Sequence, residues 1–95
     1  MDLSHYILSC NYYNYNLIKY FRNNISIFKH YHISDAKGTD GEGVLIGKGD
    51  IIDSGLLDIV LKDKFKVKVL ETWQGHLNGL SKFKIDINTI AKILK

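Results

Sequence analysis

The chain has 95 residues, of which 45% are hydrophobic and 24% charged, and its formal net charge is +3. This length supplies one hydrophobic core, so we expect a single domain over residues 1–95. The apolar content excludes a disordered chain, and no apolar run reaches the length of a membrane span, so we expect no membrane partner.

The N-terminal third predicts a strand, a helix and a second strand. Residues 5–10 have the composition of a first strand. Asn14 is a suitable N-cap for a helix in which Leu17, Ile18 and Phe21 recur on one face. Apolar residues alternate over 25–33, which favours a strand there.

The middle of the chain predicts a loop followed by short strands. Residues 34–43 are rich in Gly, Asp, Ser and Thr and show no periodicity, which is typical of a loop. Residues 44–46, 51–52 and 56–61 are apolar runs separated by turn residues, and we expect three strands joined by tight turns.

The C-terminal third contains two alternating segments and a helix signal. Over 64–73, phenylalanine, valine and tryptophan alternate with lysine, which predicts a strand with the apolar side chains inward. Residues 81–87 repeat the pattern, and Asn88 suits the N-cap of a final helix. The fold class expected is α+β: a mostly antiparallel sheet of about five to six strands, one helix in the N-terminal half and a short C-terminal helix.

A row of lysines is the first candidate for a binding site. If residues 74–79 close a hairpin, five lysines lie side by side on one sheet face: Lys64, Lys66, Lys68, Lys82 and Lys84. Such a face attracts phosphates or an acidic protein surface. The alternative is the solvated outer face of an antiparallel sheet. Because arginine is almost absent, diffuse attraction is favoured over sequence-specific reading of nucleic acid.

Charge is segregated along the chain. Residues 34–61 carry six carboxylates against two lysines, and residues 62–95 carry eight lysines against three carboxylates. An acidic middle between basic ends bears on the choice of partner more than on the fold. The acidic segment 35–58 is therefore an alternative docking surface.

Tyrosines gather between residues 12 and 20. Tyr13 and Tyr15 are candidate partner-binding residues, because tyrosine anchors protein interfaces and can stack on bases. The alternative is that about half of these rings pack in the core and expose only their hydroxyls.

Catalytic and metal sites lack a specific pattern. Cys10 could pair with a histidine as a nucleophile, but a buried strand cysteine is favoured. Asp50, Asp53 and Asp58 suit solvated turns better than a magnesium site. His30 and His32 share a strand face, and His5 or His76 could join them as metal ligands, but no cysteine pair or HExxH motif supports such a site. The loop 34–43 lacks the calcium-loop spacing. We expect no catalytic residue, metal or cofactor.

The leading hypothesis is a small non-enzymatic binding protein that docks on a macromolecule, most plausibly another protein. Abundant Ile, Lys, Asn and Tyr indicate AT-rich coding DNA, which fits an inhibitor or immunity-type factor of a phage or mobile element. A nucleic-acid-binding module that uses the lysine-rich sheet face is the alternative. The lone cysteine cannot form an internal disulfide, so we expect a cytoplasmic location.

Overall fold

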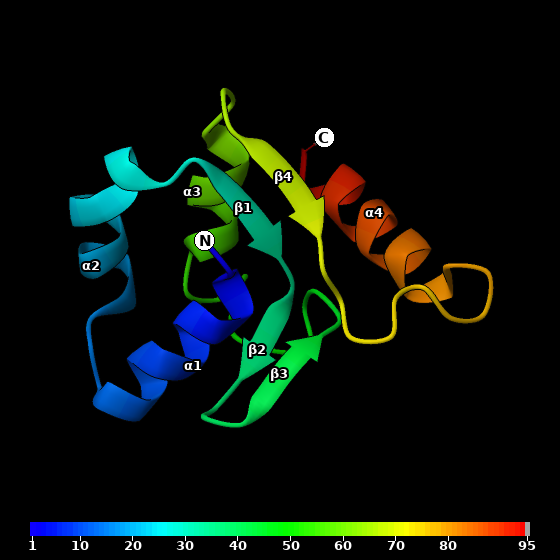
Figure 1. Cartoon of the computed structure of the whole chain (residues 1–95), viewed down its shortest axis with the longest axis horizontal. Helices are drawn as coiled ribbons and strands as arrows, with labels where there is room; N and C mark the ends of the chain where they lie inside the picture. Colours follow the sequence, from blue (N-terminus) through cyan, green and yellow to red (C-terminus); the bar gives the residue numbers. More distant parts are fainter. Residues whose placement is uncertain (95) are drawn as a thin grey trace.

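The structure is a computed structural model that describes residues 1–94. In chain order, the elements are α1 (Leu3–Tyr13), α2 (Leu17–Asn24), the 3-10 helix η1 (Ile25–Ile27), β1 (His30–Ile33), β2 (Asp35–Lys37), β3 (Gly41–Val44), α3 (Leu56–Lys62), β4 (Val67–Leu70) and α4 (Ser81–Leu94). Figure 1 shows helices packed around two small sheets. No helix within residues 1–94 is long and apolar enough to cross a bilayer.

The fold is α+β, but the expected sheet of five to six mostly antiparallel strands is wrong. The strands within residues 1–94 form two sheets of two strands each. Strands β1 and β4 pair in parallel, with His30 opposite Val67 and Ile33 opposite Leu70. Strands β2 and β3 pair antiparallel, with an irregularity between Asp35 and Lys37.

The predicted first strand is helix α1. The side chain of Asp2 caps this helix by accepting a hydrogen bond from the backbone N–H of His5 at 3.1 Å. Leu3, Ile7 and Cys10 are buried, and their spacing of four and three residues lines one helix face. Helix α2 lies where the sequence predicted a helix, with Asn16 rather than Asn14 as its N-cap, but α1 precedes it, so the expectation of one helix in the N-terminal half is wrong.

Two further predicted strands are helical. Residues 56–61 lie in α3, where Leu56, Leu57 and Val60 are buried. Residues 81–87 lie in α4, so the C-terminal helix is longer than expected and begins before Asn88. Phe83, Ile87, Ile90 and Leu94 are spaced by four, three and four residues, a helical period that outweighs the local alternation.

The core lies between α1, α2, β1 and α3. Its buried members are Leu3, Ile7, Phe21, Tyr31, Ile33, Ala36, Ile46, Ile51, Leu56, Leu57 and Val60. Phe21 contacts the rings of Tyr6, Phe28 and Tyr31 at centroid distances of 5.7, 5.1 and 6.0 Å. An aromatic cluster therefore joins α1, α2 and β1.

The inward and outward faces of strand β4 are the reverse of those expected. Paired residues of parallel strands point to the same face, so Lys68 lies on the face of Tyr31, and Leu70 lies on the face of buried Ile33. Val67 and Val69 instead lie on the outer face and are exposed. Phe65 and Trp73, also expected inward, are exposed as well.

Candidate functional site

The lysines of the predicted face do not share one surface. Lys64 and Lys66 precede β4, Lys68 lies in β4, and Lys82 and Lys84 lie in the helix α4. The expected hairpin that would align them is absent from residues 1–94, because segment 74–80 leads into a helix. The expectation of one lysine-rich sheet face is therefore wrong.

Two of these lysines stabilise the fold around Tyr31. The Lys66 ammonium donates to the Ile25 carbonyl at 2.6 Å, pairs with Asp63 at 2.9 Å and lies 5.6 Å from the centre of the Tyr31 ring. The Lys68 ammonium donates to the backbone carbonyls of Asp63 and Lys66 at 2.6 and 3.0 Å. Their stems cover apolar surface while their charges are held by these oxygens.

The predicted tyrosine residues lie on the surface in a stack. Tyr13 and Tyr15 are stacked with centroids 5.6 Å apart, and Tyr15 and Tyr20 are stacked at the same distance. Tyr12 contacts Tyr13 edge to face. All four rings are more than half exposed, so this tyrosine stack, formed by Tyr12, Tyr13, Tyr15 and Tyr20, is a surface feature at the end of α1 and the start of α2.

A cleft lies elsewhere, at the other end of α1. We call it the acidic cleft; its volume is about 780 Å³. It is lined by Asp2, Ser4, His5, Ser34, Asp40, Glu42, Gly43, Glu71, Thr72, Trp73, Gln74, His76 and Leu77. Four of these residues carry carboxylates and none is a lysine or arginine.

Parallel pairing of β1 and β4 builds one wall of the acidic cleft. Ser34 follows β1 and Glu71 follows β4. Because the two strands are parallel, their carboxyl ends lie at the same edge of the sheet, and Ser34 and Glu71 lie there side by side. The N–H of Glu71 donates to the carbonyl of Ile33 at 2.9 Å, which extends the pairing by one residue.

Gly43 of β3 connects two other walls of the acidic cleft, helix α1 and the segment that follows β4. Its N–H donates to the hydroxyl of Ser4 on α1 at 2.9 Å, and its carbonyl accepts from the N–H of Trp73 at 2.9 Å. Gly43 has a φ of +66°, and a Cβ there would lie 3.1 Å from the Cβ of Trp73. Glycine is therefore required for this close approach of three segments.

His5 lies between two carboxylates of the cleft. Its Nε2 bonds to Glu42, and its Nδ1 lies 3.5 Å from an oxygen of Asp2. The hydrogen bond with Glu42 and the negative charge of Asp2 raise the pKa of His5 above its ordinary value. Protonation of His5 thus offsets part of the negative charge of the cleft at acidic pH.

The remaining carboxylates of the cleft differ in their partners. Glu71 bonds to Nδ1 of His32 at 2.9 Å. Asp40 forms no ion pair among the described residues, and its side chain is exposed at the rim. Four carboxylates in one cleft, with no lysine or arginine beside them, attract cations.

Asp35 lies in β2, within the segment 34–43 that was expected to be a loop, and it organises the turns that follow β3. Strands were expected at 44–46 and 51–52, but of these residues only Val44 lies in a strand. The buried carboxylate of Asp35 accepts hydrogen bonds from four backbone N–H groups, those of Ala36, Gly47, Gly49 and Ile51, at 2.7 to 2.9 Å. A Cβ on Gly49 would lie 2.1 Å from the Ala36 carbonyl oxygen. Asp35 is therefore a structural carboxylate.

The other sequence candidates are dispersed. Cys10 is buried, on α1 rather than on a strand. Asp50 accepts from Asn11 and Gly38, and Asp58 pairs with Lys62 at 2.9 Å. No group of three or more His, Cys, Asp or Glu side chains within residues 1–94 could hold a metal ion.

Comparisons of this chain with protein-family models, curated proteins and solved structures gave no match. The candidate site therefore rests on its geometry. Sequence reasoning missed the acidic cleft, although residues 71–76 offered a signal: a polar run that contains tryptophan follows directly after a strand.

Proposed function

We propose that this protein is a non-enzymatic binding domain that docks on a partner protein and receives a lysine or arginine side chain of that partner in the acidic cleft. One observation carries the proposal: the chain has a net charge of +3, yet its cleft of about 780 Å³ is lined by four carboxylates and by no lysine or arginine. A cleft lined by one sign of charge concentrates the opposite charge and speeds association.

Trp73 gives the cleft a second means of binding a cation. Its side chain is 67% exposed while it lines the cleft. A guanidinium or ammonium over an indole face gains about 0.5–1 kcal/mol at an exposed site and more when water is excluded. Tryptophan is also among the residues that contribute most to protein interfaces.

The acidic cleft supports a protein partner over a nucleic acid. Its carboxylates repel phosphates, and the lysines that would bind phosphates are divided between the segment 64–68 and α4. A small inhibitor or immunity-type factor remains the class we propose. A cytoplasmic location is also proposed, because the lone cysteine cannot form an internal disulfide.

The first test uses a peptide of alternating arginine and glycine, with a matched peptide in which glutamate replaces arginine. Trp73 is the only tryptophan of the chain, so its fluorescence reports directly on the cleft. We expect the arginine peptide to change Trp73 fluorescence in a saturable, salt-sensitive manner and the glutamate peptide to have no effect.

Two carboxylate variants and one control locate the binding site. Glu42→Gln and Glu71→Gln should each weaken the arginine peptide about threefold to tenfold. Asp58→Asn removes the same charge from the exposed side of α3 and should leave binding unchanged. Equal losses in all three variants would show non-specific attraction and contradict the proposal.

A separate experiment tests whether the tyrosine stack takes part in binding. Tyr13 and Tyr15 stay predicted partner-binding residues, and they lie at the opposite end of α1 from the cleft residue His5. The double change Tyr13→Ser and Tyr15→Ser should not alter binding of the arginine peptide. Single-stranded DNA that bound the protein and was lost in this double variant would favour the nucleic-acid alternative instead.

A further inference from the structure

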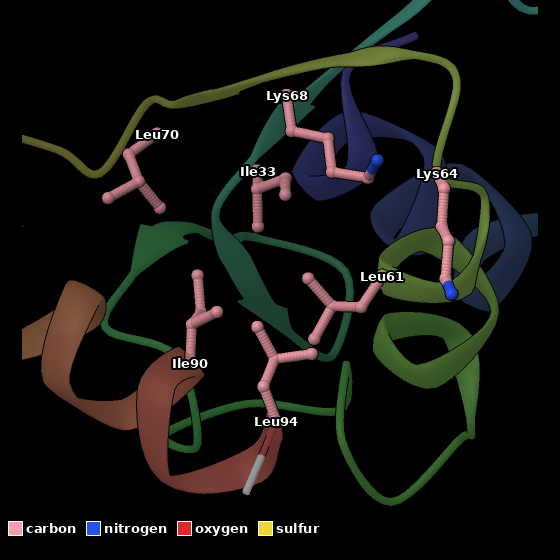
Figure 2. Close-up of a pocket in the computed structure, with 7 residues that line it drawn as sticks. All are labelled: Ile33, Leu61, Lys64, Lys68, Leu70, Ile90 and Leu94. Atoms are coloured by element: carbon pink, nitrogen blue, oxygen red, sulfur yellow. The ribbon is translucent and has the colours of Figure 1, made fainter.

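A second hollow lies between α3, β4 and α4, and it has a different chemistry (Figure 2). We call it the aliphatic groove; its volume is about 390 Å³. It is lined by Ile33, Leu61, Lys64, Lys68, Leu70, Ile90 and Leu94. Five of the seven side chains are aliphatic, and no carboxylate lines the groove.

The aliphatic side chains come from four elements and converge. Figure 2 shows Leu61 of α3 and Ile90 and Leu94 of α4 directed toward the space below Ile33 of β1. Leu94 is 63% exposed, so α4 leaves part of its apolar side uncovered at this point. Apolar surface in a concave site of this size suits a small aliphatic ligand.

The two lysines give the groove a polar end. In Figure 2, both ammonium nitrogens lie on the side of the groove opposite Leu70. The Lys64 ammonium has no carboxylate partner within residues 1–94, and its side chain is exposed. The Lys68 ammonium is held by the carbonyls of Asp63 and Lys66 and contacts no carboxylate directly.

We propose that the aliphatic groove binds a free fatty acid, with the alkyl chain against Leu61, Leu70 and Ile90 and the carboxylate beside Lys64 and Lys68. An aliphatic lining with positive charge at one end matches a molecule with one apolar end and one anionic end. This site is separate from the acidic cleft, because the two share no lining residue. The inference therefore does not depend on the proposed docking function.

The probe is dodecanoate below its micelle concentration, measured by calorimetry and by backbone amide chemical shifts. We expect one site per chain, with the largest shifts in α3, β4 and α4. Shortening the chain from dodecanoate to decanoate should weaken binding by about fourfold for each methylene removed from the groove. Dodecyltrimethylammonium, with the same chain and a positive head, should bind at least tenfold more weakly.

Variants test the polar end and the aliphatic wall separately. Lys64→Glu should weaken dodecanoate at least tenfold, while Lys29→Glu, an equal charge change at an exposed residue outside the groove, should not. Leu94→Glu should abolish binding. Its control is Ile85→Glu, which adds the same carboxylate to an exposed aliphatic position of α4 outside the groove.

Three results would overturn the proposal. Binding of several dodecanoate molecules per chain, lost equally in the control variants, would indicate detergent-like adsorption. Equal affinity for the anionic and cationic amphiphiles would remove the role of Lys64. A dimer in sedimentation that Leu94→Glu converts to a monomer, without any binding of dodecanoate, would show that a second copy covers the groove.

Discussion

The carboxylate of Asp86 accepts hydrogen bonds from the hydroxyl of Thr72 and from the backbone N–H of Ile46, and these contacts join α4 to the rest of the molecule. Asp86 is the only buried residue of this helix within the described part of the chain. Helix α4 is therefore attached by a polar anchor as well as by its apolar side.

Replacing Asp86 should weaken the attachment of α4 to the rest of the molecule. An Asp86→Asn substitution places an NH₂ group where one of two donors now binds, so we expect a loss of about 1–3 kcal/mol in the free energy of unfolding. Urea denaturation measures this loss. The exposed change Asp58→Asn serves as the control, with an expected effect within about 0.5 kcal/mol. Unaltered stability of Asp86→Asn would mean that the apolar contacts alone hold the helix.

Replacing the buried carboxylate of Asp35 should lower the free energy of unfolding more than replacing that of Asp86. In Asp35→Asn, the amide NH₂ replaces an oxygen that accepts two N–H groups, which leaves buried donors unpaired. We expect a loss of about 3 kcal/mol or more. Asp53→Asn, an exposed change in the following turn, should be close to neutral. Similar melting temperatures for the two variants would contradict the structural role of Asp35.

His5 predicts a dependence of stability on pH. Because the folded-state pKa of His5 is raised above the ordinary value of 6.5, its contribution is fully present below that value and is lost as pH rises through the folded pKa. The melting temperature of the natural chain should exceed that of His5→Gln near about pH 5, and the difference should shrink toward about pH 9. A constant difference would show that charge at His5 does not matter.

The same histidine should control the acidic cleft. As pH rises and His5 loses its proton, the carboxylates of Asp2 and Glu42 are no longer offset, so binding of the arginine peptide should tighten. In His5→Gln, this pH dependence should be reduced, and titration of Trp73 fluorescence at several pH values measures it. Weaker binding at higher pH would contradict the assignment of His5 to the cleft.

Tyr31 and Asp63 predict the response to acid. The Tyr31 hydroxyl donates to Asp63 at 2.7 Å, and this hydrogen bond, followed by that of Lys66, holds the pKa of Asp63 below its ordinary value. The stability from a lowered pKa is present above the unfolded value of 3.8 and is lost as pH falls through the folded pKa. Tyr31→Phe should therefore cost about 1–2 kcal/mol at neutral pH and less in acid, with Tyr12→Phe as an exposed control.

The sequence predicted some elements correctly because their caps and hydrophobic periodicity indicate the same structure that the tertiary packing produces. The α+β class, helix α2 and a strand at β4 follow from caps and periodicity. Residues 81–87 were misassigned because the alternation of Phe83, Ile85 and Ile87 over a few residues also fits part of a helical pattern. Only the longer spacing that continues to Ile90 and Leu94 separates the two, and the assumed boundary at Asn88 concealed it.

The orientation of β4 and the location of the cleft were beyond local reasoning. An alternating segment does not by itself reveal which of its faces is inward, because a lysine can point inward when its charge finds partners there. The ammonium groups of Lys66 and Lys68 find such partners in backbone carbonyls, a carboxylate and an aromatic ring. The acidic cleft joins residues 2–5, 40–43 and 71–77, which are brought together by the parallel pairing of β1 with β4 and by the hydrogen bonds of Gly43 with Ser4 and Trp73. Such pairing depends on tertiary contacts.

The thiol of Cys10 has a practical consequence for studies of motion. It is the only thiol of the chain, and it is 3% exposed on the inner side of α1. A reagent such as a disulfide dye can reach it only after α1 has moved away from its neighbours. The rate of labelling under native conditions therefore measures how often the helix that carries both His5 and Tyr13 opens, and no substitution is needed to introduce the thiol.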